Sequence, residues 1–142
     1  MSKMVVIYWS GTGNTEVMAN AVADGGKAAG VDVAVIPVDD ASKEHVVEAD
    51  FIALGCPSMG AEVLEEDSME PFVESLSGLD WDNKKLVLFG SFDWGDGDWM
   101  RYWEERMKGY GATLVQDGLI VHLEPNDDDI NSCKDLGNAL VE

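Results

Sequence analysis

Near its start the chain reads Lys3-Met4-Val5-Val6-Ile7-Tyr8-Trp9-Ser10-Gly11-Thr12-Gly13-Asn14-Thr15, an apolar run followed directly by hydroxyls, glycines and one amide. The apolar run predicts a buried strand, and apolar residues at helical spacing after Asn14 predict a helix. The two glycines let the backbone turn tightly and bring its N–H groups close to an anion. Ser10, Thr12, Asn14 and Thr15 add polar side chains where the helix begins, so this loop is predicted to bind a phosphate.

The loop has no basic side chain, which bears on the kind of phosphate it would bind. A Walker-type loop ends in Gly-Lys-Ser/Thr, whereas here Gly13 is followed by Asn14-Thr15-Glu16. The dinucleotide fingerprint G-x-G-x-x-G also fails, because Glu16 stands where its third glycine is needed. A single terminal phosphate therefore fits best. The alternative is a polar helix cap that binds nothing.

Length and charge restrict the class of protein. The chain has 142 residues, which suits one domain over residues 1–142, and its 9 basic and 28 acidic residues give a formal net charge of −19 at pH 7. Such a field repels nucleic acid and anionic membranes and attracts basic partner surfaces. The acidity could instead serve only to keep the protein in solution.

The few cysteines and histidines do not form a metal-binding pattern. Cys56, Cys133, His45 and His122 lack the spacing of a structural zinc site. No window has the 18 or more apolar residues of a membrane span, and the first strand begins within a few residues, so we expect a cytoplasmic protein. Cys56 ends an apolar run and is expected to be a small buried side chain rather than a reactive thiol.

Apolar runs alternate with helical patterns along the whole chain. The expected strands are 4–9, 31–38, 50–56, 85–91 and a split last region, 112–115 with 119–123; the expected helices are 14–29, 43–49, 69–76, 98–110 and 130–141. This alternation, with runs too apolar for a half-exposed sheet, predicts a doubly wound α/β fold with a five-stranded parallel sheet. Ligands of such folds bind beyond the carboxyl ends of the strands, where the strand order reverses.

Three loops occupy those carboxyl ends: Ser10 to Thr15, then Pro57-Ser58-Met59-Gly60-Ala61-Glu62, then Phe92-Asp93-Trp94-Gly95-Asp96-Gly97. Together with the neighbouring segments they are similar to clostridial-type flavodoxins. The matching segments are Tyr8 to Glu16, Leu54-Gly55-Cys56-Pro57-Ser58-Met59-Gly60, Glu70-Pro71-Phe72, Leu88-Phe89-Gly90-Ser91 and Trp94-Gly95. From end to end the chain resembles a short-chain flavodoxin.

The resemblance implies a three-layer α/β/α fold with strand order 2-1-3-4-5 and a monomer that binds FMN tightly but not covalently. It implies an electron carrier rather than an enzyme, one that shuttles at low potential between semiquinone and hydroquinone. Its expected partners are reductases and oxidoreductases with basic surfaces. Carboxylates near the flavin would oppose the negative charge of the fully reduced ring and so lower the potential of the second step.

The resemblance also implies a role for each loop. Residues 10–15 would hold the phosphate, Met59 and Trp94 would flank the flavin ring, and the peptide after Gly60 would turn over on reduction. Glu62 would bond to the pyrimidine edge, with Glu65, Glu66 and Asp67 as surface charge nearby. The implied cofactor-binding residues are Ser10, Gly11, Thr12, Gly13, Asn14, Thr15, Pro57, Ser58, Met59, Gly60, Ala61, Glu62, Ser91, Phe92, Asp93, Trp94 and Gly95.

Two positions depart from the family pattern. Phe92-Asp93 stands where the family usually has Tyr-Gly, and Ala61 stands where relatives often have a polar residue. If the backbone at position 93 required a positive φ, aspartate would be one of the few residues to tolerate it. Asp93 would also add negative charge close to the flavin.

Other readings of the chain remain open at this point. An FMN-dependent NAD(P)H or quinone reductase shares the fold but needs a site for a hydride donor. A phosphoryl-accepting signalling domain needs an aspartate at the end of the third strand, where this chain has Gly55-Cys56. Trp94 could be an ordinary exposed aromatic, and the acidic run 65–67 could be a solvated helix start.

Overall fold

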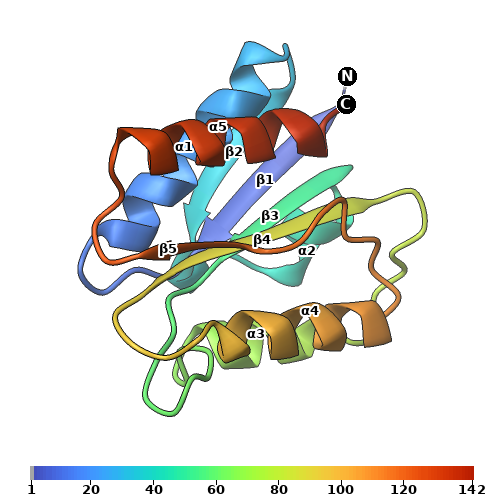
Figure 1. Cartoon of the computed structure of the whole chain (residues 1–142). Coiled ribbons are helices and arrows are strands. Elements are labelled where there is room, and N and C mark those ends of the chain that lie inside the picture. The colour runs from blue at the N-terminus through green and yellow to red at the C-terminus, as the bar shows by residue number, and fades with distance from the viewer. Residues whose placement is uncertain (1) are drawn as a thin grey trace.

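The computed structural model describes residues 2–142 and confirms the predicted doubly wound α/β fold (Figure 1). In chain order its elements are β1 (Lys3–Tyr8), α1 (Asn14–Ala28), β2 (Asp32–Pro37), the 3-10 helix η1 (Val38–Asp40), α2 (Lys43–Val47), β3 (Phe51–Gly55), α3 (Met69–Ser75), β4 (Lys85–Phe92), α4 (Asp98–Gly109), β5 (Leu119–His122) and α5 (Asp127–Leu140).

The strands form one parallel sheet in the order β2-β1-β3-β4-β5. Helices α1 and α5 cover one face of the sheet, and α3 and α4 cover the other, as Figure 1 shows. The chain steps outward from β1 to β2 and then crosses back to β3 on the other side of β1. The strand order therefore reverses beside β1, and the loops after β1 and β3 lie on either side of that reversal.

Alternation along the strands divides the core into two layers. In β1, Met4, Val6 and Tyr8 pack with α1 and α5, whereas Val5 and Ile7 face the layer that contains α3 and α4. All five are buried, as expected for a central strand covered on both faces. On α4, Trp103 packs in the same layer as Val5 and Ile7, with only 1% of its surface exposed.

Glycines allow α1 and α5 to pack closely. A Cβ atom added to Gly25 would lie 2.0 Å from the backbone oxygen of Lys134, and one added to Gly137 would lie 2.0 Å from that of Val22. No side chain fits at either distance. The two backbones therefore meet directly, and this contact fixes α1 above the sheet, with its N-terminus at the loop after β1.

The predicted boundaries differ from the structure mainly at the C-terminal end. Helix α5 begins at Asp127 rather than near residue 130, because Asn126 caps it: the Asn126 side chain accepts from the Asp129 backbone N–H at 2.8 Å. The apolar run 112–115 is not a strand but forms one isolated parallel bridge, Leu114 with Leu86. Within residues 2–142, none of the helices combines the length and hydropathy required to cross a bilayer.

Candidate functional site

The three predicted loops meet at the carboxyl edge of the sheet. They enclose a cavity of about 140 Å³ lined by Trp9, Gly11, Thr12, Thr15, Pro57, Ser58, Met59, Ser91, Phe92 and Asp93. A second, more polar hollow of about 510 Å³ runs along the first loop to Asp39 and shares Trp9, Gly11 and Thr12 with the first. Residues far apart in sequence but predicted to act together are thus brought to one place.

The first loop keeps several backbone donors free. The Ser10 Oγ accepts from the backbone N–H of Gly13 at 3.1 Å and of Glu16 at 3.2 Å, so it shapes the loop from within. Gly13 precedes α1 with φ 98°, a conformation that favours glycine. Within residues 2–142, the backbone N–H groups of Thr12, Asn14 and Thr15 have no protein acceptor. These donors at a helix N-terminus are suited to an anion.

Two further contacts hold the first loop in place. The hydroxyls of Thr15 and Ser91 lie 2.9 Å apart and are buried, which joins the start of α1 to the end of β4. The Trp9 ring lies over Gly11, since a Cβ added there would meet the ring at 3.0 Å. Trp9 was missing from the predicted site residues, although its place directly after β1 is the signal that could have identified it.

The second loop is a closed turn. Met59 and Val63 exchange two backbone hydrogen bonds of 2.9 Å, which leaves Gly60, Ala61 and Glu62 as the turn between them. Gly60 has φ 48° with open space around its Cα, and Glu62 has φ 56°. The expectation that the peptide after Gly60 turns over stays a prediction. The positive φ does show that this position uses the freedom of glycine.

Glu62 connects the second loop to the third. Its Oε1 accepts from the backbone N–H groups of Gly97 and Asp98, each at 3.1 Å, and thereby caps the N-terminus of α4. Its carboxyl group rests on Gly95, where an added Cβ would lie 2.6 Å from the carboxyl carbon. Within residues 2–142 the Oε2 atom has no hydrogen-bond partner. One carboxylate oxygen is therefore used within the protein and the other can accept from a ligand.

The prediction that Glu65 supplies surface charge is wrong. Its side chain is buried, with 7% of its surface exposed, and accepts from the backbone N–H groups of Asp67, Ser68 and Met69 at 2.8–2.9 Å. Glu65 therefore caps the start of α3, because those donors have no partner inside the helix. The neighbouring Glu66 and Asp67 are exposed, as expected.

The third loop begins at a small aromatic cluster. The Phe92 ring lies 5.7 Å from Trp99 and 5.0 Å from His122, measured between ring centroids. The His122 Nε2 lies 3.0 Å from the backbone oxygen of Asp93. Asp93 is not among the residues with positive φ, so the strain considered for this position does not occur. Trp94 is 60% exposed at the tip of the loop.

Two titratable groups beside the site are affected by burial. Burial raises the pKa of the Cys56 thiol to about 12, so it is protonated at neutral pH, and its Sγ accepts from the Glu65 backbone N–H at 3.4 Å. Its prediction as a small buried side chain is confirmed. Burial also raises the pKa of Tyr8, whose hydroxyl donates to Glu16 Oε2 at 2.9 Å.

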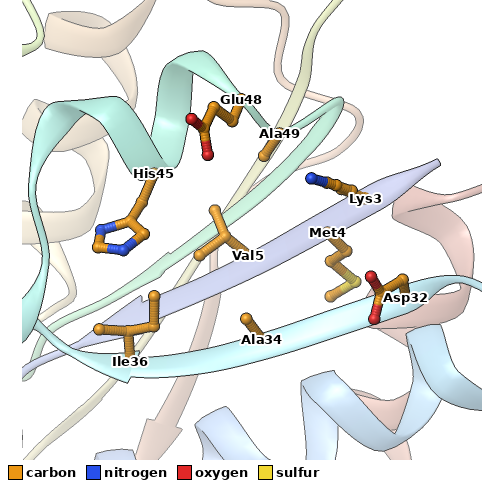
Figure 2. Close-up of a pocket in the computed structure, with 9 residues that line it drawn as sticks. All are labelled: Lys3, Met4, Val5, Asp32, Ala34, Ile36, His45, Glu48 and Ala49. Atoms are coloured by element: carbon orange, nitrogen blue, oxygen red, sulfur yellow. The ribbon is translucent and has the colours of Figure 1, made fainter. Parts of the chain in front are cut away.

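A separate apolar hollow of about 210 Å³ lies beside α2 and contains none of the predicted site residues (Figure 2). Val5, Ala34, Ile36 and Ala49 form its apolar surface, with Lys3, Asp32, His45 and Glu48 around it. It lies between α2 and the exposed edge strand β2, because the five residues of α2 are too few to cover that edge. The residues predicted to bind a ligand lie at the carboxyl edge of the sheet instead.

Comparison with known proteins gives one consistent match. The family model described as flavodoxin matches residues 6–137. The chain is similar to the flavodoxin of Clostridium beijerinckii, with 47% identity over 97% of this chain and 99% of that protein. It is also similar to the flavodoxin of Megasphaera elsdenii, with 42% identity over 96% of this chain and 97% of that protein.

Solved structures agree with this match. The two-electron reduced flavodoxin of Megasphaera elsdenii superposes with a TM-score of 0.82 at 42% identity, covering 96% of this chain and 97% of that one. The oxidised Flavodoxin 1 of Bacillus cereus superposes with a TM-score of 0.90 at 31% identity, covering 99% and 97%. The likeness therefore extends over nearly the whole chain.

Proposed function

The chain belongs to the flavodoxin family and is an electron carrier that binds FMN rather than an enzyme; we propose that the three loops at the carboxyl edge form its FMN site. Bound FMN supplies the redox chemistry, since it takes up and releases one electron at a time. The protein supplies the position of the cofactor, its shielding from water and the surrounding electric field. The alternative of a flavin-dependent reductase is not favoured by the family match.

The observation that carries this proposal is the set of free donors in the first loop. The backbone N–H groups of Thr12, Asn14 and Thr15 lie at the N-terminus of α1 without protein acceptors in residues 2–142. We propose that they hold the FMN phosphate, with Ser10 to Thr15 as its complete binding loop. A phosphate dianion fits donors of this kind without a cationic side chain.

The other two loops would enclose the ring system. Trp94 is 60% exposed, so its indole is free to cover a flat ligand, and Met59 lines the cavity from the second loop. We propose that these two side chains lie on opposite faces of the ring. Aromatic stacking of this kind contributes about 0.5–1.5 kcal/mol beyond the burial of area.

The pyrimidine edge of the ring would meet the second loop. The Oε2 of Glu62 has no hydrogen-bond partner in residues 2–142, while its Oε1 caps α4. We propose that Oε2 accepts the ring N–H. The remaining residues of the proposed site are Pro57, Ser58, Gly60, Ala61, Ser91, Phe92, Asp93 and Gly95, which belong to the same two loops or to the end of β4.

Charge supports a proposal about partners and oligomeric state. The net charge of −19 attracts proteins with basic surfaces, so we propose basic-surfaced reductases and oxidoreductases as partners. The same charge makes copies of the chain repel one another, which supports a monomer.

Cys56 and Cys133 are both free, as is usual in the reducing cytoplasm, and this supports a cytoplasmic location. We propose that residues 1–142 act as a single FMN-binding domain.

Binding of FMN compared with riboflavin tests the phosphate loop. The apoprotein should bind FMN more tightly than riboflavin, because only FMN carries the phosphate. Replacing Asn14 by proline removes one of the free N–H donors and should therefore reduce the ratio of the FMN affinity to the riboflavin affinity. Helix α1 should still form, because proline is tolerated at the first position of a helix. Thr113→Val changes an exposed residue outside the site and is the control.

The outcomes distinguish the alternatives. Equal affinities for FMN and riboflavin in the wild-type protein would show that the loop is only a helix cap. An anaerobic titration followed by absorbance should show two one-electron steps. Rapid reduction of the bound flavin by NADH alone would instead support the reductase.

A further inference from the structure

We propose that His122 is a positioning residue for the third loop, holding the Asp93 peptide so that the backbone carrying Trp94 is ordered before FMN binds. This inference rests on the proposed function, because it concerns the loop that would cover FMN. The evidence for it is the set of contacts that His122 makes. His122 is the last residue of β5 and pairs with Phe92, the last residue of β4. It therefore stands beside the point where the third loop leaves the sheet.

Three contacts join the end of β5 to the start of this loop. The His122 Nε2 lies 3.0 Å from the Asp93 backbone oxygen, and the His122 ring lies 5.0 Å from the Phe92 ring at 43°. The backbone N–H of Leu123 donates to the Phe92 oxygen at 2.9 Å. The side chain thus contacts two successive residues of the loop, one through its ring and one through its nitrogen.

The chemistry of the pair determines which group donates. A backbone carbonyl can only accept, so the contact with Asp93 requires the hydrogen on the His122 Nε2. A side chain with a ring but no N–H would keep the contact with Phe92 and lose the hydrogen bond. A side-chain amide would keep a donor and lose the ring. The two contributions can therefore be separated by substitution.

The loop is held by hydrogen bonds at both ends, and the Glu62 carboxyl group also rests on Gly95. Glu62 bonds to Gly97 and Asp98 at its far end, and His122 bonds to Asp93 at its near end. Trp94 lies between these anchors and is 60% exposed, with no core packing to fix it. The path of the backbone that carries Trp94 therefore depends on these contacts. Ordering a ligand-binding loop in advance reduces the entropy lost on binding.

The test compares His122→Phe, which keeps a ring without a donor, with His122→Gln, which keeps a donor without a ring. In the apoprotein, backbone order parameters of Trp94 and Gly95, measured by NMR relaxation, should fall in His122→Phe and stay near wild type in His122→Gln. For FMN, the dissociation constant should rise about 2- to 10-fold in His122→Phe, the factor that one hydrogen bond of about 0.5–1.5 kcal/mol gives.

The control is His45→Gln, which changes the other histidine of the chain, far from the third loop in the hollow of Figure 2. Wild-type behaviour of His122→Phe in both measurements would overturn the proposal, and so would equal loss in His122→Phe and His122→Gln. His122→Ala removes both contacts and provides the test if His122→Phe folds poorly. Failure of the wild-type protein to bind FMN would refute the proposed function, whereas the order parameters would still test the anchor.

Discussion

Removing the Glu62 side chain should destabilise the protein even without its cofactor. The Oε1 of Glu62 accepts two backbone N–H groups at 3.1 Å at the start of α4. Loss of a helix cap costs about 0.5–2 kcal/mol, and a negative charge at a helix N-terminus contributes about 0.3–1 kcal/mol. The side chain is half-buried, so we expect Glu62→Ala to lower the free energy of unfolding of the apoprotein by about 1–2 kcal/mol.

Glu62→Gln separates the hydrogen bonds from the charge. The amide keeps an oxygen that can accept both N–H groups, so we expect a loss of only about 0.5–1 kcal/mol, from the missing charge. That part should shrink as salt is raised, because salt screens the interaction of a charge with a helix end. The loss in Glu62→Ala should persist in high salt.

Urea unfolding of the apoprotein, followed by circular dichroism, provides the measurement. Glu66→Ala is the matched control, since Glu66 is an exposed glutamate four residues along the chain. We expect unfolding free energies in the order wild type, Glu62→Gln, Glu62→Ala, with Glu66→Ala close to wild type. The capping argument is wrong if Glu62→Ala and Glu66→Ala have the same stability.

Three further predictions concern charge, packing and pH. Asp93→Gly should raise the more negative of the two one-electron potentials of the FMN-loaded protein by tens of millivolts. The reason is that a carboxylate about 10 Å from the reduced ring opposes the negative charge of the ring by about 1–2 kcal/mol. A redox titration that shows no shift, or a fall, would contradict this prediction. Gly137→Ala should lower the free energy of unfolding by about 1–3 kcal/mol, because the new Cβ would lie 2.0 Å from the Val22 oxygen; unchanged urea unfolding would show that α1 and α5 can move apart freely. The hydrogen bonds from Arg106 hold the pKa of Glu70 below its ordinary value. The ionised carboxylate therefore stabilises the folded chain fully above the unfolded pKa of about 4.3, and this stabilisation is lost as the pH falls through the folded pKa. The difference in unfolding free energy between wild type and Glu70→Gln should be largest at pH 7 and disappear in acid.

The parts of the fold that follow from local patterns could be predicted from the sequence. The strands are predictable because covered parallel strands are continuously apolar, and the three loops are predictable because ligands of such sheets bind at the carboxyl ends. Apolar spacing alone predicts that α5 begins at residue 130, which is too late. Residues 127–129 are all aspartate, and the cap at Asn126 is the signal that marks the true start.

The errors and omissions at the site have identifiable physical causes. Glu65 was assigned to the surface because it stands in a run of three acidic residues, yet it turns inward to the free N–H groups of α3. Trp9 contacts Gly11 of its own loop, and its place directly after β1 is the local signal for it, whereas the contacts of His122 with Phe92 and Asp93 join the ends of two strands and have no local signal. Glu62 was predicted at the flavin edge, but its bond to α4 depends on the distance between two loops, which the sequence does not contain.

The way the chain would hold a phosphate follows from the lack of a basic side chain in the first loop. Both of its arginines are committed to carboxylates: Arg101 donates to Glu104 at 2.9 Å, and Arg106 donates to Glu70 at 2.6 and 2.8 Å. The first loop offers only uncharged donors, in a protein whose net charge is −19. Such donors would stabilise a phosphate by direct hydrogen bonds. The repulsion between that phosphate and distant carboxylates is weaker, because salt screens charges beyond about 8 Å at physiological ionic strength.

This arrangement has a consequence for selectivity. A monophosphate brings at most two negative charges, which oriented N–H groups at a helix N-terminus can stabilise. Each additional phosphate would add charge that no side chain of the first loop could neutralise, since Ser10, Thr12, Asn14 and Thr15 are all uncharged. If this loop holds the FMN phosphate as proposed, the lack of a lysine would discriminate against nucleotide polyphosphates. No cation of the loop would then offset nearby carboxylates, which would make reduction of the ring to an anion more costly.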